Sequence, residues 1–281
     1  MSARAWAAFA AMSVLWGIPY LFIKIAVDDG VPPAFLAWAR VALAAAVLLP
    51  LAARAGTLRP LRGRGWWLAL YATFEVALPY PMIAFGETRI SSATTAIGLA
   101  TVPVIASLLA LCFVPDERAG PRRVVGLLLG FGGVAALVGI DVSGDADELV
   151  GIGAIVLAAA GFAGGPFVLA RRLRGLDGRA TMGTSLALAI VPLTPFAALD
   201  PPRAVPSAGA VAAIVVLGTL CTAVALVVFA ELVRTAGPSR AVIVSYVNPL
   251  VAVALGVALL GERPGVGTMI GLVLILAGSW L

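Results

Sequence analysis

The residues best able to do chemistry in this chain are a few polar side chains inside long apolar stretches. Glu75 lies nine residues after Trp66, about 14 Å along a helix and close to the centre of one such stretch. A carboxyl group in apolar surroundings favours its neutral form, whereas a nearby cation favours the charged form. Glu75 is therefore a candidate proton-coupling residue. The alternatives are a fixed ion pair with Arg40 and contact with a substrate alone.

Two prolines mark matching places in the chain, Pro103 and Pro249, which are 146 residues apart. Each lies near the middle of an apolar stretch and has no backbone N–H, so the carbonyl four residues earlier loses its helical partner. Paired interrupted helices are a pointer to a binding site at the centre of a membrane protein. The alternative is a packing kink that a neighbouring helix accommodates. The substrate-binding candidates here are Thr94, Thr101, Pro103, Ser245, Asn248 and Pro249.

Two further groups of candidates come from the first apolar stretches. Trp16, Tyr20 and Lys24 follow the spacing i, i+4, i+8, so a regular helix would present them on one face as the wall of a substrate site. The alternative is that the rings pack and Lys24 reaches toward the membrane surface. Arg40 lies about 10 Å inside the end of its helix. A cation at that depth is costly and is expected to face the interior of the bundle.

Composition identifies the elements that must position these residues. The chain of 281 residues is 62% hydrophobic and only 12% charged, with a mean hydropathy of +1.07. A water-soluble domain cannot hide so much apolar surface, whereas a lipid bilayer can cover it. We therefore expect an all-α integral membrane protein with ten transmembrane helices. The expected spans are 5–25, 34–53, 66–86, 91–113, 122–140, 149–170, 181–199, 209–230, 238–260 and 265–281.

The arginines predict the orientation of these spans. If the N-terminus is cytoplasmic, fourteen arginines fall in cytoplasmic segments and three in external loops. Positive residues concentrate in cytoplasmic loops, so both termini are expected in the cytoplasm. The external three are Arg89, Arg203 and Arg263.

The two halves of the chain repeat one pattern, with 1–140 and 141–281 as the predicted units. Thr101-Val102-Pro103 and Glu117-Arg118 in the first half match Val247-Asn248-Pro249 and Glu262-Arg263 in the second. Because five helices per unit is an odd number, the second unit enters the membrane inverted. Inverted repeats are typical of transporters that work by alternating access. Gly126 to Gly130 and Gly267 to Gly271 form small-residue faces, for packing inside the bundle or for a homodimer contact.

With these motifs the chain resembles the ten-helix drug/metabolite exporters, which have two EamA-type domains. The resemblance rests on Trp16-Gly17, Pro33, Arg40, Pro103, Glu117-Arg118, Asn248-Pro249 and Gly261-Glu262-Arg263. The counterpart of Trp16 departs from the pattern, reading Gly161-Phe162-Ala163. The resemblance implies efflux of amino acids, other metabolites or toxic compounds.

Other functions are less well supported by the residues present. The chain has no histidine, which excludes a serine–histidine protease and an HExxH zinc site, and it has no GxxxxGK loop for ATP. No channel filter sequence is present, although an oligomer could build a pore. We predict no metal, cofactor or nucleic acid partner. The expected function is a secondary transporter, a monomer or homodimer, with a channel, importer or exchanger as alternatives to export and an enzyme disfavoured.

Overall fold

The computed structural model of the protein describes residues 3–113, 120–136, 145–236, 241, 244 and 247–280. These residues are mostly helical, and no strand occurs among them. The first half contains α1 (Ala3–Leu15), α2 (Pro19–Asp28), α3 (Pro33–Arg54), the 3-10 turn η1 (Arg59–Leu61), α4 (Gly65–Ala72), the π-helical segment η2 (Thr73–Ala77), α5 (Pro79–Glu87), α6 (Ser92–Leu99), α7 (Val102–Phe113) and α8 (Pro121–Ala136). The second half contains α9 (Ala146–Arg172), α10 (Gly178–Leu199), α11 (Ala208–Gly218), the π-helical segment η4 (Thr219–Val224), α12 (Ala225–Ala236), α14 (Asn248–Leu260) and α15 (Val266–Trp280).

Seven segments of the described chain are long and apolar enough to cross a membrane. They are Trp6–Asp28, Pro33–Arg54, Gly65–Glu87, Ser92–Leu109, Ala146–Arg172, Gly178–Leu199 and Ala208–Ala236. The shorter helices α8, α14 and α15 fall in the other three predicted spans. The structure thus confirms an all-helical protein with several membrane-length helices. Ten crossings stay a prediction, because only seven of the segments reach membrane length.

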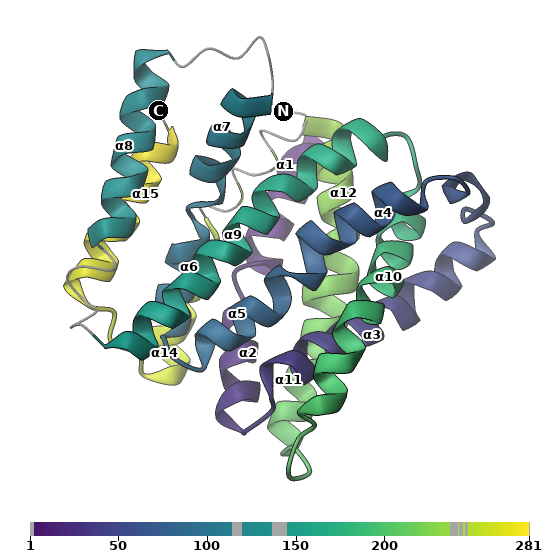
Figure 1. Ribbon diagram of the computed structural model, residues 1–281, viewed down its shortest axis with the longest axis horizontal. Helices are drawn as coiled ribbons and strands as arrows, with labels where there is room; N and C mark the ends of the chain where they lie inside the picture. The colour runs from purple at the N-terminus through teal and green to yellow at the C-terminus, as the bar shows by residue number, and fades with distance from the viewer. Residues whose placement is uncertain are drawn as a thin grey trace.

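Helices from the two halves interlock in one bundle. The most extensive contacts join α3 to α10 and α8 to α15. α3 and α10 are the second predicted spans of the two halves, and α8 and α15 are the fifth, so each helix contacts its counterpart. α5 packs on α9, and α2 packs on α11. The pair α8 and α15 stands at one edge of the bundle (Figure 1). Each of these contacts joins the two halves, so neither half has a separate core.

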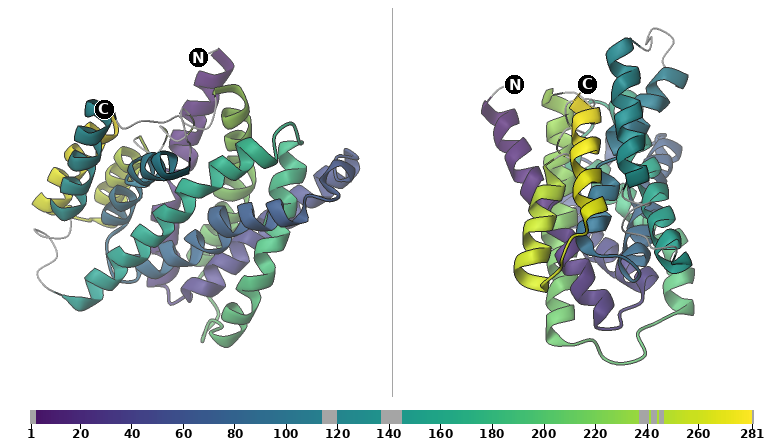
Figure 2. Two further views of the ribbon diagram at one scale, coloured as in Figure 1. Left: turned by 45° about the horizontal axis from the view of Figure 1, so that its top comes forward. Right: turned by 90° about the vertical axis from the view of Figure 1, so that its left-hand side faces the viewer.

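Both ends of the chain lie at the same end of the bundle. α1 begins there and α15 ends there, whereas the turns after α2, α10 and α14 lie at the opposite end (Figure 2). We call these the N-terminal end and the far end. An even number of crossings places both termini on one side, so the arrangement agrees with the predicted topology without showing which side faces the cytoplasm.

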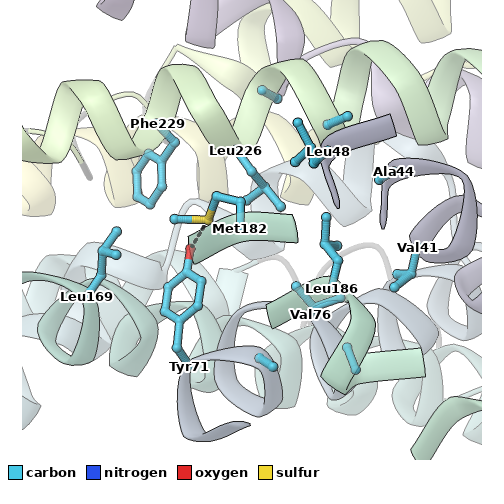
Figure 3. Close-up of a cluster of buried hydrophobic side chains, with 14 of the residues drawn as sticks. Val41, Ala44, Leu48, Tyr71, Val76, Leu169, Met182, Leu186, Leu226 and Phe229 are labelled. Carbon is cyan, nitrogen blue, oxygen red and sulfur yellow. Dashed lines mark hydrogen bonds between the residues drawn. The ribbon is translucent and has the colours of Figure 1, made fainter. Parts of the chain in front are cut away.

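Apolar side chains fill much of the interior between α3, α4, α10 and α12. Tyr71, Met182, Leu186 and Phe229 are among the largest wholly buried residues. The Tyr71 hydroxyl donates a hydrogen bond to the Met182 sulfur at 3.3 Å, across the gap between α4 and α10 (Figure 3). Burying a polar hydroxyl costs free energy unless it finds an acceptor, and the thioether supplies a weak one.

The predicted glycine face of α8 is used inside the bundle. A Cβ built on Gly133 would lie 2.9 Å from the backbone oxygen of Gly271 in α15, and one on Gly278 would collide with the backbone of Gly126 and Gly130. Only residues without a side chain allow two helix backbones to approach so closely. Packing within the bundle, the first of the two expectations for Gly126 and Gly130, is therefore what the structure shows.

The Glu262-Arg263 motif has a structural explanation at the far end. Gly261 ends α14 with a φ of +67°, which favours glycine, and this turn directs Glu262 toward the start of α6. The Glu262 carboxylate accepts hydrogen bonds from the Ser92 N–H at 2.8 Å, the Ser92 hydroxyl at 2.9 Å and the Ala93 N–H at 3.2 Å. The first N–H groups of a helix lack partners within it and favour a negative charge. Glu262 therefore fastens the loop of the second half to a helix of the first.

Candidate functional site

An internal cavity of about 70 Å³ lies where several helices are interrupted. Its lining comes from both halves: Trp16, Pro19, Tyr20, Ile23, Arg40, Glu75, Tyr80, Ile83, Ala96, Leu99, Val102, Phe162, Pro166, Phe229 and Asn248. A space of this size holds a few water molecules. A metabolite would therefore need the surrounding helices to move apart.

Proline interrupts the helices around the cavity. α6 ends at Leu99 and α7 begins at Val102, because Pro103 has no N–H to donate to the Leu99 carbonyl. α14 begins at Asn248, with Pro249 in its first turn, where a missing N–H costs little. The predicted interruption is confirmed in the fourth span. In the ninth span a helix begins at Asn248, and most of residues 237–246 lie outside the described part of the chain. Irregular backbone is tolerated at membrane depth only beside protein or a water-filled cavity.

Glu75 is held in the π-helical segment η2. Pro79 follows it by four residues and cannot donate to its carbonyl, and the Leu78 N–H bonds instead to the Thr73 carbonyl, five residues back, at 3.1 Å. The Glu75 side chain is 1% exposed, and its Oε2 atom has no hydrogen-bond partner in the described part of the chain. It lies against the backbone of α9, where a Cβ on Gly165 would collide with Oε2. The wider turn and the missing side chain together make room for a buried carboxyl group.

Asn248 brings a second acceptor to the cavity. It is 5% exposed at the start of α14, and its Oδ1 atom has no hydrogen-bond partner among the residues that the structure describes. Buried polar atoms are nearly always paired, and an exception in a native protein needs an explanation. Here Asn248 Oδ1 and Glu75 Oε2 belong to side chains that line the same cavity. The site can therefore receive hydrogen-bond donors from a ligand.

Arg40 lies inside the bundle and is 4% exposed. Its Nε and Nη2 atoms donate to the Thr222 hydroxyl at 3.2 and 3.0 Å, and its guanidinium lies 4.0 Å from the centre of the Tyr80 ring. The structure shows no salt bridge between Arg40 and Glu75, although both line the cavity. Hydroxyl and ring contacts, including a cation–π contact, stabilise this cation and leave Glu75 without a fixed counterion.

The second π-helical segment is the counterpart of the first. η4 begins at Thr219 and η2 at Thr73, which are 146 residues apart, the same offset as the two prolines. In η4 the Thr222 hydroxyl donates to the Leu217 carbonyl, five residues back, at 2.7 Å. π-Helical turns inside α-helices often occur at functional sites. Here one presents Glu75 to the cavity, and the other presents the hydroxyl that holds Arg40.

Aromatic rings form one wall of the cavity. Trp16 lies 6.4 Å from Phe162 with nearly parallel planes and 4.6 Å from Phe229, measured between ring centres. Trp16 and Phe162 are 146 residues apart, so Phe162 replaces the tryptophan in the second half and packs on its own counterpart. The departure from the family pattern in Gly161-Phe162-Ala163 thus keeps an aromatic ring at the centre of the molecule.

A wider opening of about 800 Å³ lies at the N-terminal end. We call it the vestibule. It is lined by Ala7, Ala8 and Ala11 of α1, Leu169 and Ala170 of α9, the turn 173–179 between α9 and α10, Thr181 and Met182 of α10, and residues of α12 from Val227 to Arg234. Phe162 of α9 and Phe229 of α12 belong to two of these elements, and Trp16 directly follows α1. Phe229 lines the cavity, and its neighbours Val228 and Ala230 line the vestibule, so α12 adjoins both spaces.

The structure places several predicted site residues away from the cavity. Lys24 binds the Asp28 carboxylate at 3.1 Å and the Glu87 backbone oxygen at 3.1 Å. Trp16 and Tyr20 line the cavity, whereas Lys24 is absent from its lining. Lys24 lies one helical turn beyond Tyr20 in α2, closer to the far end. Depth along the helix, rather than the face, therefore separates Lys24 from the other two residues.

The structure also places the two threonines before Pro103 away from the cavity. Thr94 and Thr101 line a small space of about 10 Å³ against Ile152 and Ile155 of α9. The Thr101 hydroxyl donates to the Gly98 carbonyl at 2.7 Å, so it serves the helix end. Pro103 and Pro249 shape the backbone and are absent from the lining of the cavity, and Ser245 lies outside the described residues.

Sequence reasoning missed several residues that the structure brings to this region. Tyr80, Phe229 and Thr222 had no motif to mark them, although Tyr80 lies five residues after Glu75 on the same span. Glu87 falls just past the predicted span 66–86, yet it is 0% exposed. No group of three or more His, Cys, Asp or Glu side chains that could hold a metal occurs among the residues described.

The fold and the cavity agree with the comparisons with known proteins. The EamA-like transporter family matches residues 4–139 and 149–281, so the chain belongs to this family. Both halves match the same family, which supports the repeat. The resemblance drawn from the motifs is confirmed.

Two of the relatives that the chain resembles are named as uncharacterized transporters. The chain is 29% identical over 263 residues to the uncharacterized inner membrane transporter YedA of Escherichia coli K12, covering 90% of this chain and 81% of YedA. It is 26% identical to an uncharacterized transporter of Archaeoglobus fulgidus, covering 95% and 93%. It is 30% identical to PagO of Salmonella typhimurium, but the match spans 47% of this chain and 42% of PagO. A protein of known crystal structure shares the fold, with a TM-score of 0.70 at 20% identity over 99% of this chain and 96% of that protein.

Proposed function

We propose that the protein is a secondary transporter of the inner membrane that exports a small metabolite, amino acid or toxic compound by alternating access. The observation that carries this proposal is the internal cavity, which is lined by both halves of an inverted repeat at the level of their interrupted helices. Such sites allow one half to rock against the other around a bound solute. Ten crossings with both termini in the cytoplasm complete the proposed topology.

The lining of the cavity supports a solute that has hydrogen-bond donors and an apolar body. Glu75 Oε2 and Asn248 Oδ1 are acceptors without partners. The rings of Trp16, Tyr80 and Phe162 offer apolar faces, and aromatic faces also attract cations. An ammonium group near Glu75, with its carbon skeleton against the rings, would satisfy both features. Amino acids and organic amines share this chemistry.

Export is the direction that we propose, and the vestibule and the charges support it. The vestibule opens at the N-terminal end, which the arginine distribution predicts to be cytoplasmic. At the far end, a smaller opening of about 460 Å³ is lined by Val27, Thr88 and Asp200. We therefore take the vestibule, the larger of the two openings, as the route by which a solute enters from the cytoplasm.

Proton coupling is assigned to Glu75. The carboxyl group lies at the cavity without a counterion, so its protonation can respond to what enters. A proton arriving from outside would displace the solute, and an arriving solute would displace the proton. The fixed ion pair with Arg40 is less well supported, because Arg40 is engaged by Thr222 and Tyr80.

The first experiment identifies the substrate. Purified protein is screened by thermal shift against amino acids, organic amines, nucleosides and sugars, because a ligand of the folded state raises its stability. A hit is then assayed in proteoliposomes for saturable uptake and counterflow. A channel would show neither saturation nor counterflow, and that result would overturn the proposal that the protein is a transporter.

The second experiment tests the site with matched variants. Asn248→Ala is expected to weaken binding of the hit by about tenfold, as for loss of one buried hydrogen bond. Glu75→Gln is expected to abolish transport driven by a pH gradient while solute exchange survives. Thr101→Val, which changes a hydroxyl facing away from the cavity, is the control and should behave as wild type. Unchanged pH dependence in a stable Glu75→Gln protein would remove the coupling role.

A further inference from the structure

A second carboxyl group is buried in the far half of the bundle. Glu87 is the last residue of α5 and is 0% exposed, and neither of its carboxylate oxygens has a hydrogen-bond partner in the described part of the protein. An ionised carboxylate without donors or a counterion is very costly in an apolar interior. Neither the family nor the proposed role of Glu75 accounts for it.

Glu87 lies just beyond the cavity. Tyr80, Ile83 and Glu87 follow the spacing i, i+3, i+7, so they share one face of α5. Tyr80 and Ile83 line the cavity, and Glu87 is one turn closer to the far end. Glu75 is twelve residues earlier, about 18 Å along the same span. The two buried acids therefore lie at different depths on one segment.

A lysine already lies beside Glu87. The Lys24 ammonium is 3.1 Å from the backbone oxygen of Glu87 and 3.1 Å from an Asp28 carboxylate oxygen. The other charged or titratable groups that face Glu87 are Asp28 and Tyr20 of α2, Arg40 of α3, and Glu262 after α14. Glu262 is engaged by the start of α6, and Arg40 by Thr222. Lys24, held by an exposed aspartate, is the cation with freedom to move.

We propose that Glu87 is a second proton-binding site, and that Lys24 pairs with Asp28 when the far end is closed and with Glu87 when it is open. In the conformation described here Glu87 carries a proton, and Lys24 pairs with Asp28. When the far end opens, water reaches Glu87, its proton passes to that water, and the carboxylate draws the Lys24 ammonium from Asp28. One proton passes from Glu87 to water, and no other covalent bond changes. The proton on Glu87 thereby favours the closed far end, because binding to one state shifts the equilibrium toward it.

This inference rests on the proposed alternating access, but its test needs no substrate. Infrared spectra of the purified full-length protein are recorded as the pH is raised, and the C=O band of protonated carboxyl groups is followed. The Glu75→Gln variant leaves Glu87 as the buried acid of that segment. The matched control is Glu75→Gln with Glu87→Gln, which replaces a neutral acid by an amide of the same shape.

The expected result is a carboxyl band that Glu75→Gln retains, that the double variant lacks, and that disappears as the pH rises. Adding Lys24→Met should move the midpoint of that loss upward by about one pH unit or more, because the ionised form loses its cation. Asp28→Asn should move it downward, because Lys24 is then free for Glu87.

Two results would overturn the proposal. Identical spectra for the single and double variants would mean that Glu87 carries no proton. A band that persists at every pH, unaffected by Lys24→Met, would make Glu87 a fixed structural acid. Circular dichroism and gel filtration of each variant confirm that the fold is intact. The spectra do not depend on the outcome of the flux experiments with Glu75→Gln. Proton coupling by Glu75 and proton binding by Glu87 can therefore be disproved independently.

Discussion

A single missing side chain makes room for the acid at the centre of the cavity. Glu75 fits because Gly165 of α9 presents bare backbone to its carboxyl group. The neighbouring Gly164 is less confined, since a Cβ there would lie 3.5 Å from the Phe74 ring, which is ordinary contact. Two adjacent glycines thus have different roles, and only the geometry separates them.

We predict that Gly165→Ala destabilises the protein, whereas Gly164→Ala is tolerated. The added methyl group collides with the Glu75 carboxyl group, and overpacking of this kind costs about 1 to 3 kcal/mol. Thermal unfolding in detergent measures the loss. In a Glu75→Ala background the same Gly165→Ala change should cost almost nothing, because the colliding atoms are gone. An equal loss in both backgrounds would show that the glycine serves another contact.

Helices are interrupted by residues within their own span, whereas a helix end can be held by a residue far away in the chain. The break between α6 and α7 follows from Pro103, a property of a few consecutive residues. The start of α6, in contrast, is held by Glu262, which is 170 residues away from Ser92. Such a long-range cap joins one interrupted helix of the first half to a loop of the second half.

We predict that Glu262→Gln loosens the start of α6. The variant keeps the shape but loses the charge that three donors share, and hydrogen bonds to a charged group contribute about 1.5 to 3 kcal/mol. Hydrogen exchange of the amides from Ser92 to Ala96 should become faster, and the melting temperature should fall. Asp200→Asn, in another loop of the far end, is the control and should change neither. Unaltered exchange at Ser92 and Ala93 would contradict the capping role.

The whole molecule is one bundle made of two interlocked halves. Contacts between α3 and α10 and between α8 and α15 pair each helix with its counterpart. Inversion of the second half gives the cavity two related walls, with Trp16 stacked on Phe162. Because α1 begins and α15 ends at one end of the bundle, a single measurement of orientation fixes every loop (Figure 2).

We predict that Arg62 is cytoplasmic and Arg203 is external. In a background with Cys112→Ser and Cys221→Ser, a cysteine at each position is tested in turn with a maleimide that cannot cross membranes. Arg203→Cys should react in intact spheroplasts, whereas Arg62→Cys should react only after permeabilisation. The physical reason is the excess of arginine on the cytoplasmic side. The opposite pattern would reverse the orientation and turn the proposed exporter into an importer.

The sequence alone determined the features that depend on neighbouring residues. Apolar length predicted where helices lie, because the bilayer thickness sets the run needed to cross it. Pro103 predicted the interruption in the fourth span, because a missing N–H acts within one turn. The 146-residue offset predicted the repeat, to which the family match corresponds.

Only the tertiary structure decided which side chains meet. Helical spacing predicts a shared face but not where a cavity ends along it, so it grouped Lys24 with Trp16 and Tyr20, although Lys24 lies beyond the cavity and binds Asp28. The sequence of a helix face made of small and polar residues also does not show which element packs against it. In the structure, Thr94 and Thr101 face α9. Glu87 ends a helix in the sequence, yet helices from elsewhere in the chain cover it completely. Burial depends on what packs across a residue, and that information lies far away in the chain.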